Sequence, residues 1–223
     1  MGQKVDPRGH RMGTFKKRPS ERFGTTQQQG SSFFVEDIKI RELVESFYFR
    51  IGISKVVIRK TEKEGEVLMF TAKPASILGK DGETLAKFEK KLMEITGRPF
   101  KVTVKDIKVP ELSAKIMSEF MAVQLESRMP YRRVAKSVLQ KVMEKGAIGV
   151  KVQVGGRLGG ADISRSEKFS DGRIPLQTMR ADIDYHYTTA LTKYGILGIK
   201  VWICVGENTQ ISKKQVALDK VLS

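Results

Sequence analysis

The sequence has very few of the residues from which several kinds of protein site are built. Its 223 residues include one cysteine, Cys204, and only two histidines. A single cysteine cannot form an internal disulfide, and one Cys with two His is too few for a Cys/His zinc site. Cys204 stands in the apolar run ILGIKVWICV, a setting typical of a buried, unreactive thiol. These shortages exclude a disulfide-stabilised domain and a structural zinc domain, and no metal site is expected.

Long apolar segments are missing as well. No run of eighteen apolar residues is available to cross a bilayer, and the N-terminus lacks the apolar core of a secretory signal. We therefore expect no membrane partner and a cytoplasmic protein.

Positive charge, in contrast, is abundant. The chain has 41 Lys and Arg against 25 Asp and Glu, a net charge of +16. This excess favours a polyanionic partner, but charge alone does not distinguish nucleic acid from an anionic membrane or an acidic protein. The pattern of residues has to decide.

Residues 1–34 are predicted to form a basic N-terminal arm. It carries seven cations against Asp6 and Glu21, among Gly, Pro, Thr and Gln, and cannot bury enough apolar surface to fold alone. We expect it to become ordered on a partner, with Lys4, Arg8 and Arg11 among its RNA contacts; a solvated tail is the alternative.

Residues 35–109 are predicted to follow the order α-β-β-α-α-β. An amphipathic helix begins at Val35, and the strand-like runs ISKVVIRK and EVLMFTAK are joined by a hairpin loop at Glu62–Gly65. A short helix after Pro74, the helix TLAKFEKKLMEI and the alternating strand FKVTVKD complete the domain.

Residues 110–206 are predicted to form a second α+β domain, and residues 207–223 a short flexible tail. Two helices, after Pro110 and Pro130, precede four strand-like stretches, IGVKVQV, DISRSEKF, ADIDYHYT and ILGIKVWICV. We expect the two helices to pack on a largely antiparallel four-stranded sheet. In the first helix, Leu112, Ile116, Phe120 and Val123 are predicted to face inward.

The glycines of ILGKDGE are the first candidate site. Four G-x-x-G matches occur, and with 20 glycines roughly two are expected by chance, so the bare pattern is weak. Only Gly79-Lys80-Asp81-Gly82 lies between two predicted helices, where backbone N–H groups and a helix N-terminus suit a phosphate. It fits neither a Walker loop nor a dinucleotide fingerprint, so no nucleotide, cofactor or small-molecule substrate is expected. Together with the element order, it matches a type II KH domain, whose GXXG loop clamps about four nucleotides of a single strand. A glycine-capped helix junction without a ligand is the alternative.

The segment MPYRRVAKSVLQKVMEK contains the second candidate site. Tyr131, Val134, Ala135, Val138 and Val142 share one helical face, and Arg132, Arg133, Lys136, Gln140 and Lys141 share the other. The cations begin in the first turn, where the helix dipole disfavours them by a few tenths to about 1 kcal/mol each. We interpret Arg132, Arg133 and Lys136 as RNA phosphate contacts; a solvated face is the alternative.

A metal-dependent enzyme is the main alternative from another class. In a strand, Asp182, Asp184 and His186 would share one face and could bind a divalent metal for RNA cleavage. Pairing of these aspartates with neighbouring arginines, among them Arg157, Arg165, Arg173 and Arg180, explains the same residues without a metal. A free KH protein that regulates messenger RNA is a further alternative.

Several segments resemble one known family. The opening MGQKVDP, the segment ILGKDGE, the helix with YRRVAK and above all GRLGGADISRSEKFSDGRIPLQTMRADIDY resemble the bacterial-type small-subunit ribosomal protein number three. The similarity extends to about Val205, and its most specific part is the run from Gly156 to Tyr185.

The resemblance implies a two-domain, non-enzymatic protein in the head of the small ribosomal subunit, bound to ribosomal RNA and located at the messenger RNA entrance. Residues matching Arg132, Arg133 and Lys136 would face incoming messenger RNA and assist its unwinding, driven by translocation of the ribosome. Neighbouring head proteins and two proteins of the entrance pore would be its partners. The loop from Gly79 to Gly82 and the cations Arg157, Arg165 and Arg173 are further predicted RNA contacts. The sequence leaves open whether the ribosome is cytoplasmic or organellar.

Overall fold

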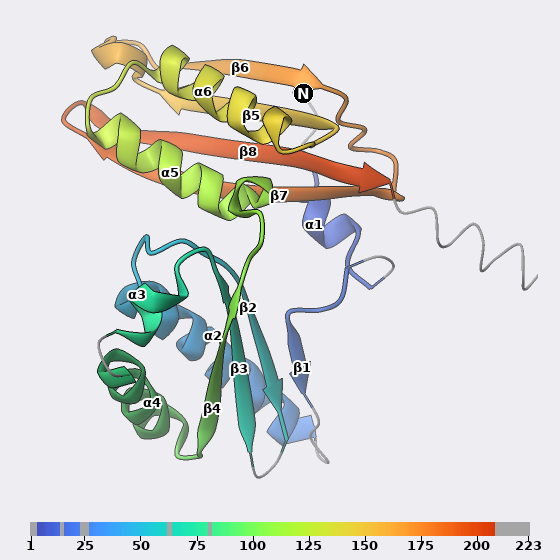
Figure 1. Cartoon of the computed structure of the whole chain (residues 1–223), viewed down its shortest axis with the longest axis vertical. Helices are drawn as coiled ribbons and strands as arrows, with labels where there is room; N and C mark the ends of the chain where they lie inside the picture. The colour runs from blue at the N-terminus through green and yellow to red at the C-terminus, as the bar shows by residue number, and fades with distance from the viewer. Residues whose placement is uncertain (1–3, 14–15, 23–26, 62–63, 80–81, 208–223) are drawn as a thin grey trace, which may run out of the picture. The chain divides into compact units, whose positions relative to one another are not determined.

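The computed structural model describes residues 4–13, 16–22, 27–61, 64–79 and 82–207 (Figure 1). The chain forms two compact units. One comprises Arg18–Pro110, and the other combines Met1–Lys17 with Glu111–Ser223. The segment predicted as a separate arm is therefore divided between the two units. Within the described residues, no helix combines the length and the apolar character needed to cross a bilayer.

The unit Arg18–Pro110 has the predicted order α-β-β-α-α-β, which is confirmed. Its elements are α2 (Gln27–Phe47), β2 (Ile53–Lys60), β3 (Gly65–Thr71), α3 (Pro74–Leu78), α4 (Glu83–Thr96) and β4 (Phe100–Asp106). Strands β2 and β3 form an antiparallel hairpin, and β4 is parallel to β3. A short strand that was not predicted, β1 (Ser20–Arg22), pairs in parallel with β2 and gives the sheet order β1-β2-β3-β4.

Helices α2 and α4 cover one face of this sheet (Figure 1). Ile40 and Val44 from α2 and Phe88 and Leu92 from α4 pack against alternate strand residues such as Val67. The period of 3.6 in the helices and of two in the strands places these side chains on facing surfaces. Gly97, with φ +65°, ends α4 and donates its N–H to the Met93 carbonyl.

The other unit is built on a wholly antiparallel sheet in the order β6-β5-β8-β7. Its strands are β5 (Gly149–Gly156), β6 (Arg165–Gly172), β7 (Ala181–Thr192) and β8 (Gly195–Glu207). Helices α5 (Ala114–Glu126) and α6 (Tyr131–Glu144) both lie on one face of it (Figure 1). The predicted architecture, two helices on an antiparallel four-stranded sheet, is confirmed. The short helix α1 (Pro7–His10) also belongs to this unit and lies beside β7.

The core of this unit lies between the sheet and the two helices. Strand residues that point toward the helices, such as Val152 and Val201, pack in one cluster with residues of the inner face of α6, such as Val134 and Val138. The inward face predicted for α5 is only partly correct: Leu112, in the turn before the helix, and Phe120 pack against the core while remaining half-buried. Val123 is 45% exposed, and the buried residues of this helix are Ala114, Met117, Ser118, Met121, Ala122 and Leu125. Small residues at 114, 118 and 122 let α5 approach the sheet closely, so the larger Ile116 and Phe120 lie at its edge.

Candidate nucleic-acid interface

The two glycines of the KH-type loop adopt conformations that favour glycine. Gly79 follows α3 with φ +74°, and Gly82 precedes α4 with φ +79°. A Cβ at position 79 would collide with the side chain of Thr84, so the tight turn requires glycine there. The sequence interpretation of a glycine-dependent turn that opens a helix therefore agrees with the backbone. Lys80 and Asp81 lie outside the described residues.

Helix α6 separates its apolar and basic faces as predicted. Val134, Ala135, Val138 and Val142 are buried, whereas Arg132, Arg133, Lys136, Gln140 and Lys141 are exposed. No acidic residue stands in its first turn. The side chains of Arg133 and Lys136 make no hydrogen bond or ion pair with any residue that the structure describes. Two cations of the helix thus point to solvent with their charge uncompensated.

Arg132 is held by residues of its own unit. Its Nη2 donates to Glu167 Oε1 at 3.2 Å, and its Nε donates to the Tyr131 hydroxyl at 3.1 Å. The Tyr131 hydroxyl donates to the same Glu167 oxygen at 2.9 Å. The hydrogen bonds from Arg132 and Tyr131 lower the pKa of Glu167, so this carboxylate is charged at neutral pH. The Arg132 side chain is nevertheless 67% exposed, and polyanion phosphates would compete with Glu167 for it.

The N-terminal cations have different roles from one another. Lys4 and Arg8 are exposed, and Arg8 pairs with Asp6 at 3.4 Å. Arg11 is fully buried, so its assignment as an RNA contact was wrong. Its guanidinium donates to the carbonyls of Pro7, Pro175, Leu176, Thr178 and Ala181, at 2.6 to 3.4 Å. All its donors point into protein, and Arg11 fastens the N-terminal segment to the loop before β7. The expectation that the whole arm orders only on a partner is corrected by the same contacts.

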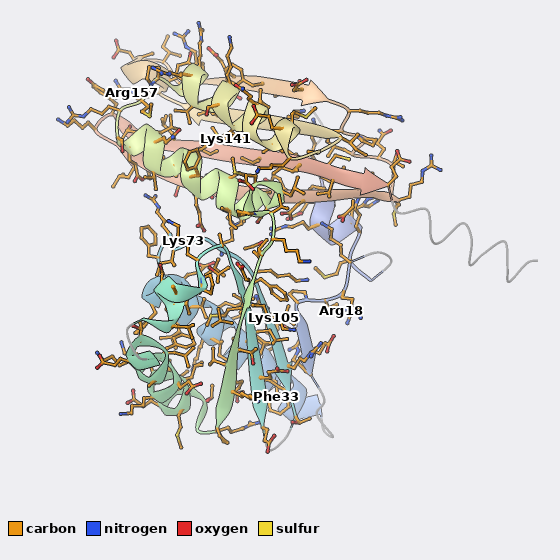
Figure 2. All side chains as sticks on the ribbon, in the orientation of Figure 1. Arg18, Phe33, Lys73, Lys105, Lys141 and Arg157 are labelled. Carbon is orange, nitrogen blue, oxygen red and sulfur yellow. The ribbon has the colours of Figure 1, made fainter. Side chains whose placement is uncertain are left out.

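Three arginines near the second sheet were also predicted as RNA contacts. Arg165 and Arg173 are exposed, and their side chains have no hydrogen bond or ion pair among the described residues. Arg157 (Figure 2) is engaged internally: it donates to the carbonyls of Ala161 and Tyr194 and pairs with Asp162 at 3.2 Å. Arg157 therefore orders the loop that follows β5, which leaves it fewer free donors for RNA.

The acidic residues of β7 do not form a metal site. Asp184 Oδ2 accepts from the Ala114 N–H at 2.9 Å and caps α5, whereas Asp182 pairs with Lys16 at 3.0 Å. His186 Nδ1 lies 3.1 Å from Ser118 Oγ and 3.0 Å from Thr188 Oγ1. Within the described part of the chain, no group of three His, Cys, Asp or Glu residues could hold a metal ion. The arginine pairing proposed for these aspartates is also wrong, because Lys16 and a backbone N–H take that place.

The sequence reading missed one further group of cations on the second sheet. Lys151, Lys168 and Lys200 lie on adjacent strands β5, β6 and β8, and all three point away from the helices. The signal was present in the alternation of lysine with valine in VKVQV and IKVWI, which implies a basic face opposite the buried one.

The fold and these surfaces define the class of protein: an RNA-binding protein built from a KH domain and a second basic α+β domain. Comparison with known families agrees. Residues 39–112 match the KH domain model, and residues 121–203 match the model of the ribosomal protein S3 C-terminal domain.

Known relatives share most of the chain. Small ribosomal subunit protein uS3 of Finegoldia magna is 44% identical over 93% of this chain and 84% of its own length. The proteins of the same name from Carboxydothermus hydrogenoformans and Persephonella marina are 40% and 43% identical, over 96% and 97% of this chain and 96% and 95% of their own lengths. The chain belongs to the uS3 family of ribosomal proteins, and it is not an enzyme.

Proposed function

We propose that this chain binds ribosomal RNA in the head of the small subunit and contacts messenger RNA at the entrance channel through helix α6. As a member of its family, the chain is a structural constituent of the small ribosomal subunit, in the cytoplasm. The position in the head, the messenger RNA contact and the neighbouring head and entrance-pore proteins are the finer parts of the proposal.

One observation carries the messenger RNA contact: the uncompensated cations on the exposed face of α6. Arg133 and Lys136 point to solvent near the N-terminal end of the helix, and Arg133, in the first turn, costs stability there. Cations on such a face attract phosphates regardless of base sequence, which suits a partner whose sequence changes continuously. Contacts with the phosphates of one messenger RNA strand would hold that strand while the ribosome moves, and would so assist unwinding. The energy would come from translocation, so this chain would need no nucleotide site of its own.

The KH-type loop is proposed as a second contact, with ribosomal RNA. Gly79 and Gly82 allow the backbone to approach a phosphate closely, and α4 begins directly after Gly82. Lys4, Arg165 and Arg173 are proposed as further phosphate contacts because they are exposed.

Ribosomes carrying Arg133→Gln with Lys136→Gln test the messenger RNA contact. We expect slower translation through a stable hairpin, weaker crosslinking to messenger RNA upstream of decoding, and an unchanged rate on an unstructured message.

A matched control removes two positive charges at the C-terminal end of α6, with Lys141→Gln in the last turn and Lys145→Gln at the C-cap. Lys141 (Figure 2) stands near the Phe120 ring, and Lys145 is 4.0 Å from Glu111, so both are already engaged. Equal slowing by the two double variants, or no slowing by the first, would contradict the proposal.

A further inference from the structure

The second sheet has one face that no helix covers. Side chains alternate along each strand, so residues beside those of the core point away from α5 and α6. We call this side the outer face, and its central residues are Lys151, Lys168, Tyr185, Tyr187, Lys200 and Trp202. Helix α6, which carries the exposed cations described above, lies on the opposite side of the same sheet (Figure 1).

The N-terminal segment covers only part of the outer face. Near the start of β7, Ala181 and Ile183 are buried with Cys204, and Arg11 and Lys16 donate to the carbonyls of Ala181 and Ile183. The cover extends to Tyr185, where the Arg8 guanidinium lies 5.8 Å from the ring centroid. Nearer the turn between β7 and β8, Tyr187 is 49% exposed among the described residues, and we call this region the open part.

The open part presents one aromatic ring, that of Tyr187, beside an ammonium group. The Tyr187 ring lies over Gly198, where an added Cβ would come within 3.3 Å of the ring. Lys200 Nζ lies 5.9 Å from the centroid of the Tyr187 ring, and Lys151 Nζ lies 5.5 Å from that of Trp202. Tyr185 and Trp202, with ring centroids 5.1 Å apart, belong to the neighbouring covered cluster, in which Trp202 is only 9% exposed. Because Gly198 has no side chain, the phenol can lie down across β8 instead of standing upright.

Positive charge predominates in the open part of this surface. None of the described strand residues that point to the outer face is a carboxylate, from Lys151 to Gly155, Ser166 to Ser170, Tyr185 to Leu191 and Ile196 to Trp202. Burial, and then repulsion from Lys4 and Lys168, lower the pKa of Lys151. These positive groups lie close together, and no carboxylate of the described strand segments just named lies among them, so this surface complements a polyanion.

We propose that the outer face binds single-stranded RNA, with a base stacked on Tyr187 and the phosphates on Lys200, Lys168 and Lys151. Bases stack on exposed aromatic rings of a sheet only where the strand is unpaired, and cations beside the rings hold the backbone. A duplex offers phosphates but no free base face, so this site distinguishes a single strand from a helix. The contact is independent of α6, and the chain can therefore bind RNA on both sides of its second sheet.

The test uses the full chain with Arg133→Gln and Lys136→Gln already in place, so that binding by α6 is reduced. The probe is a labelled 12-nucleotide oligoadenylate containing one 2-aminopurine, with the same sequence as a duplex for comparison. Tyr187→Leu is expected to weaken single-strand binding about fivefold or more and to remove quenching of 2-aminopurine, because stacking is lost. Tyr187→Phe keeps the ring and is expected to bind like the parent.

Charge is tested separately by the dependence of binding on salt. Lys200→Gln is expected to lower the slope of log K against log salt by roughly 0.7, as one lost phosphate contact on a single strand does. Lys90→Gln, an exposed lysine on α4, is the matched control and should leave quenching unchanged. Circular dichroism checks that each variant is folded. If Tyr187→Leu is unfolded, the proposal is judged by two other results: the salt slope of Lys200→Gln and the quenching of 2-aminopurine by the parent.

Equal binding by the parent and Tyr187→Leu, or equal affinity for single strand and duplex without quenching, would overturn the proposal. So would a photo-crosslinker at exposed Leu191 that, in cells, labels an acidic protein and no RNA. Crosslinks to unpaired RNA would support it.

Discussion

At the scale of single residues, His186 shows how burial fixes a protonation state. Its ring lies between α5 and β7 against Ser118 and Thr188, and Ser118 is fully buried. Burial, followed by the charges of Lys115 and Arg8, lowers the pKa of His186 to about 4. The imidazole is therefore neutral at physiological pH, and its Nδ1 is hydrogen-bonded to the hydroxyls of Ser118 and Thr188.

This pKa predicts a stability that depends on pH. The unfolded ring has an ordinary pKa near 6.5, so between pH 6.5 and about 4 the unfolded chain binds more protons than the folded one. Stability due to the neutral ring is present above pH 6.5 and is lost as the pH falls through this window. We expect a loss of about 1–2 kcal/mol, after allowance for screening by solvent.

Urea unfolding of the parent and of His186→Gln, at pH 7 and pH 4.5, measures this effect. The difference in unfolding free energy between the two proteins should shrink or change sign at the lower pH. A difference that is the same at both values would show that His186 does not titrate on unfolding.

At the scale of elements, α6 carries a conflict between stability and binding. Its first turn holds Arg132 and Arg133 and no acidic residue, although the positive end of the helix dipole lies there. Arg133→Gln should raise the unfolding free energy by about 0.3–1 kcal/mol and weaken RNA binding. Thermal unfolding at low and high salt measures the first effect, which salt should reduce. Stabilisation without any loss of RNA affinity would mean that the cation serves no contact.

The faces of the helices could be predicted only where polar and apolar residues are cleanly separated. In α6, valines and cations occupy opposite sides, and the prediction from spacing was correct. In α5, apolar residues stand on most of the surface, so spacing did not reveal that Ala114, Ser118 and Ala122 are the contact face. The orientation of α5 is set by close packing of these small residues against the sheet, and the spacing of hydrophobic residues does not reveal such packing.

Contacts distant in sequence explain the remaining differences. Strand β1, Ser20–Arg22, has no strand-like pattern and forms only because β2 offers it a free edge. Arg11 looked like one more exposed cation, since the carbonyls that surround it are supplied mostly by residues 164 to 170 positions later. The G-x-x-G turn, the α6 cations and the order of elements are local features, and these the sequence did predict.

At the scale of the whole molecule, the N-terminal segment is a structural part of the unit that contains residues 111–207. Replacing Arg11 by Met removes donors from buried carbonyls and leaves them unsatisfied. We expect the unfolding free energy of this unit to fall by about 2–4 kcal/mol, with that of the unit Arg18–Pro110 unchanged.

Calorimetry, which resolves the two units as separate transitions, is the measurement. Lys17→Met, at an exposed position of the same segment, is the control and should move neither transition. A shift in both transitions, or in neither, would contradict this role for Arg11.

The long separation of Arg11 from its partners also sets an order of events during synthesis. Arg11 leaves the ribosome 170 residues before Ala181, which at about 5–20 residues per second is a delay of roughly 8–35 s. During that interval the residues of the unit Arg18–Pro110 are all made and can fold, whereas α1, Arg11 and Lys16 do not yet have β7 to dock on. The beginning of the chain is therefore among the last parts to reach its final place, and a nascent chain arrested before β7 would still display this basic segment unbound.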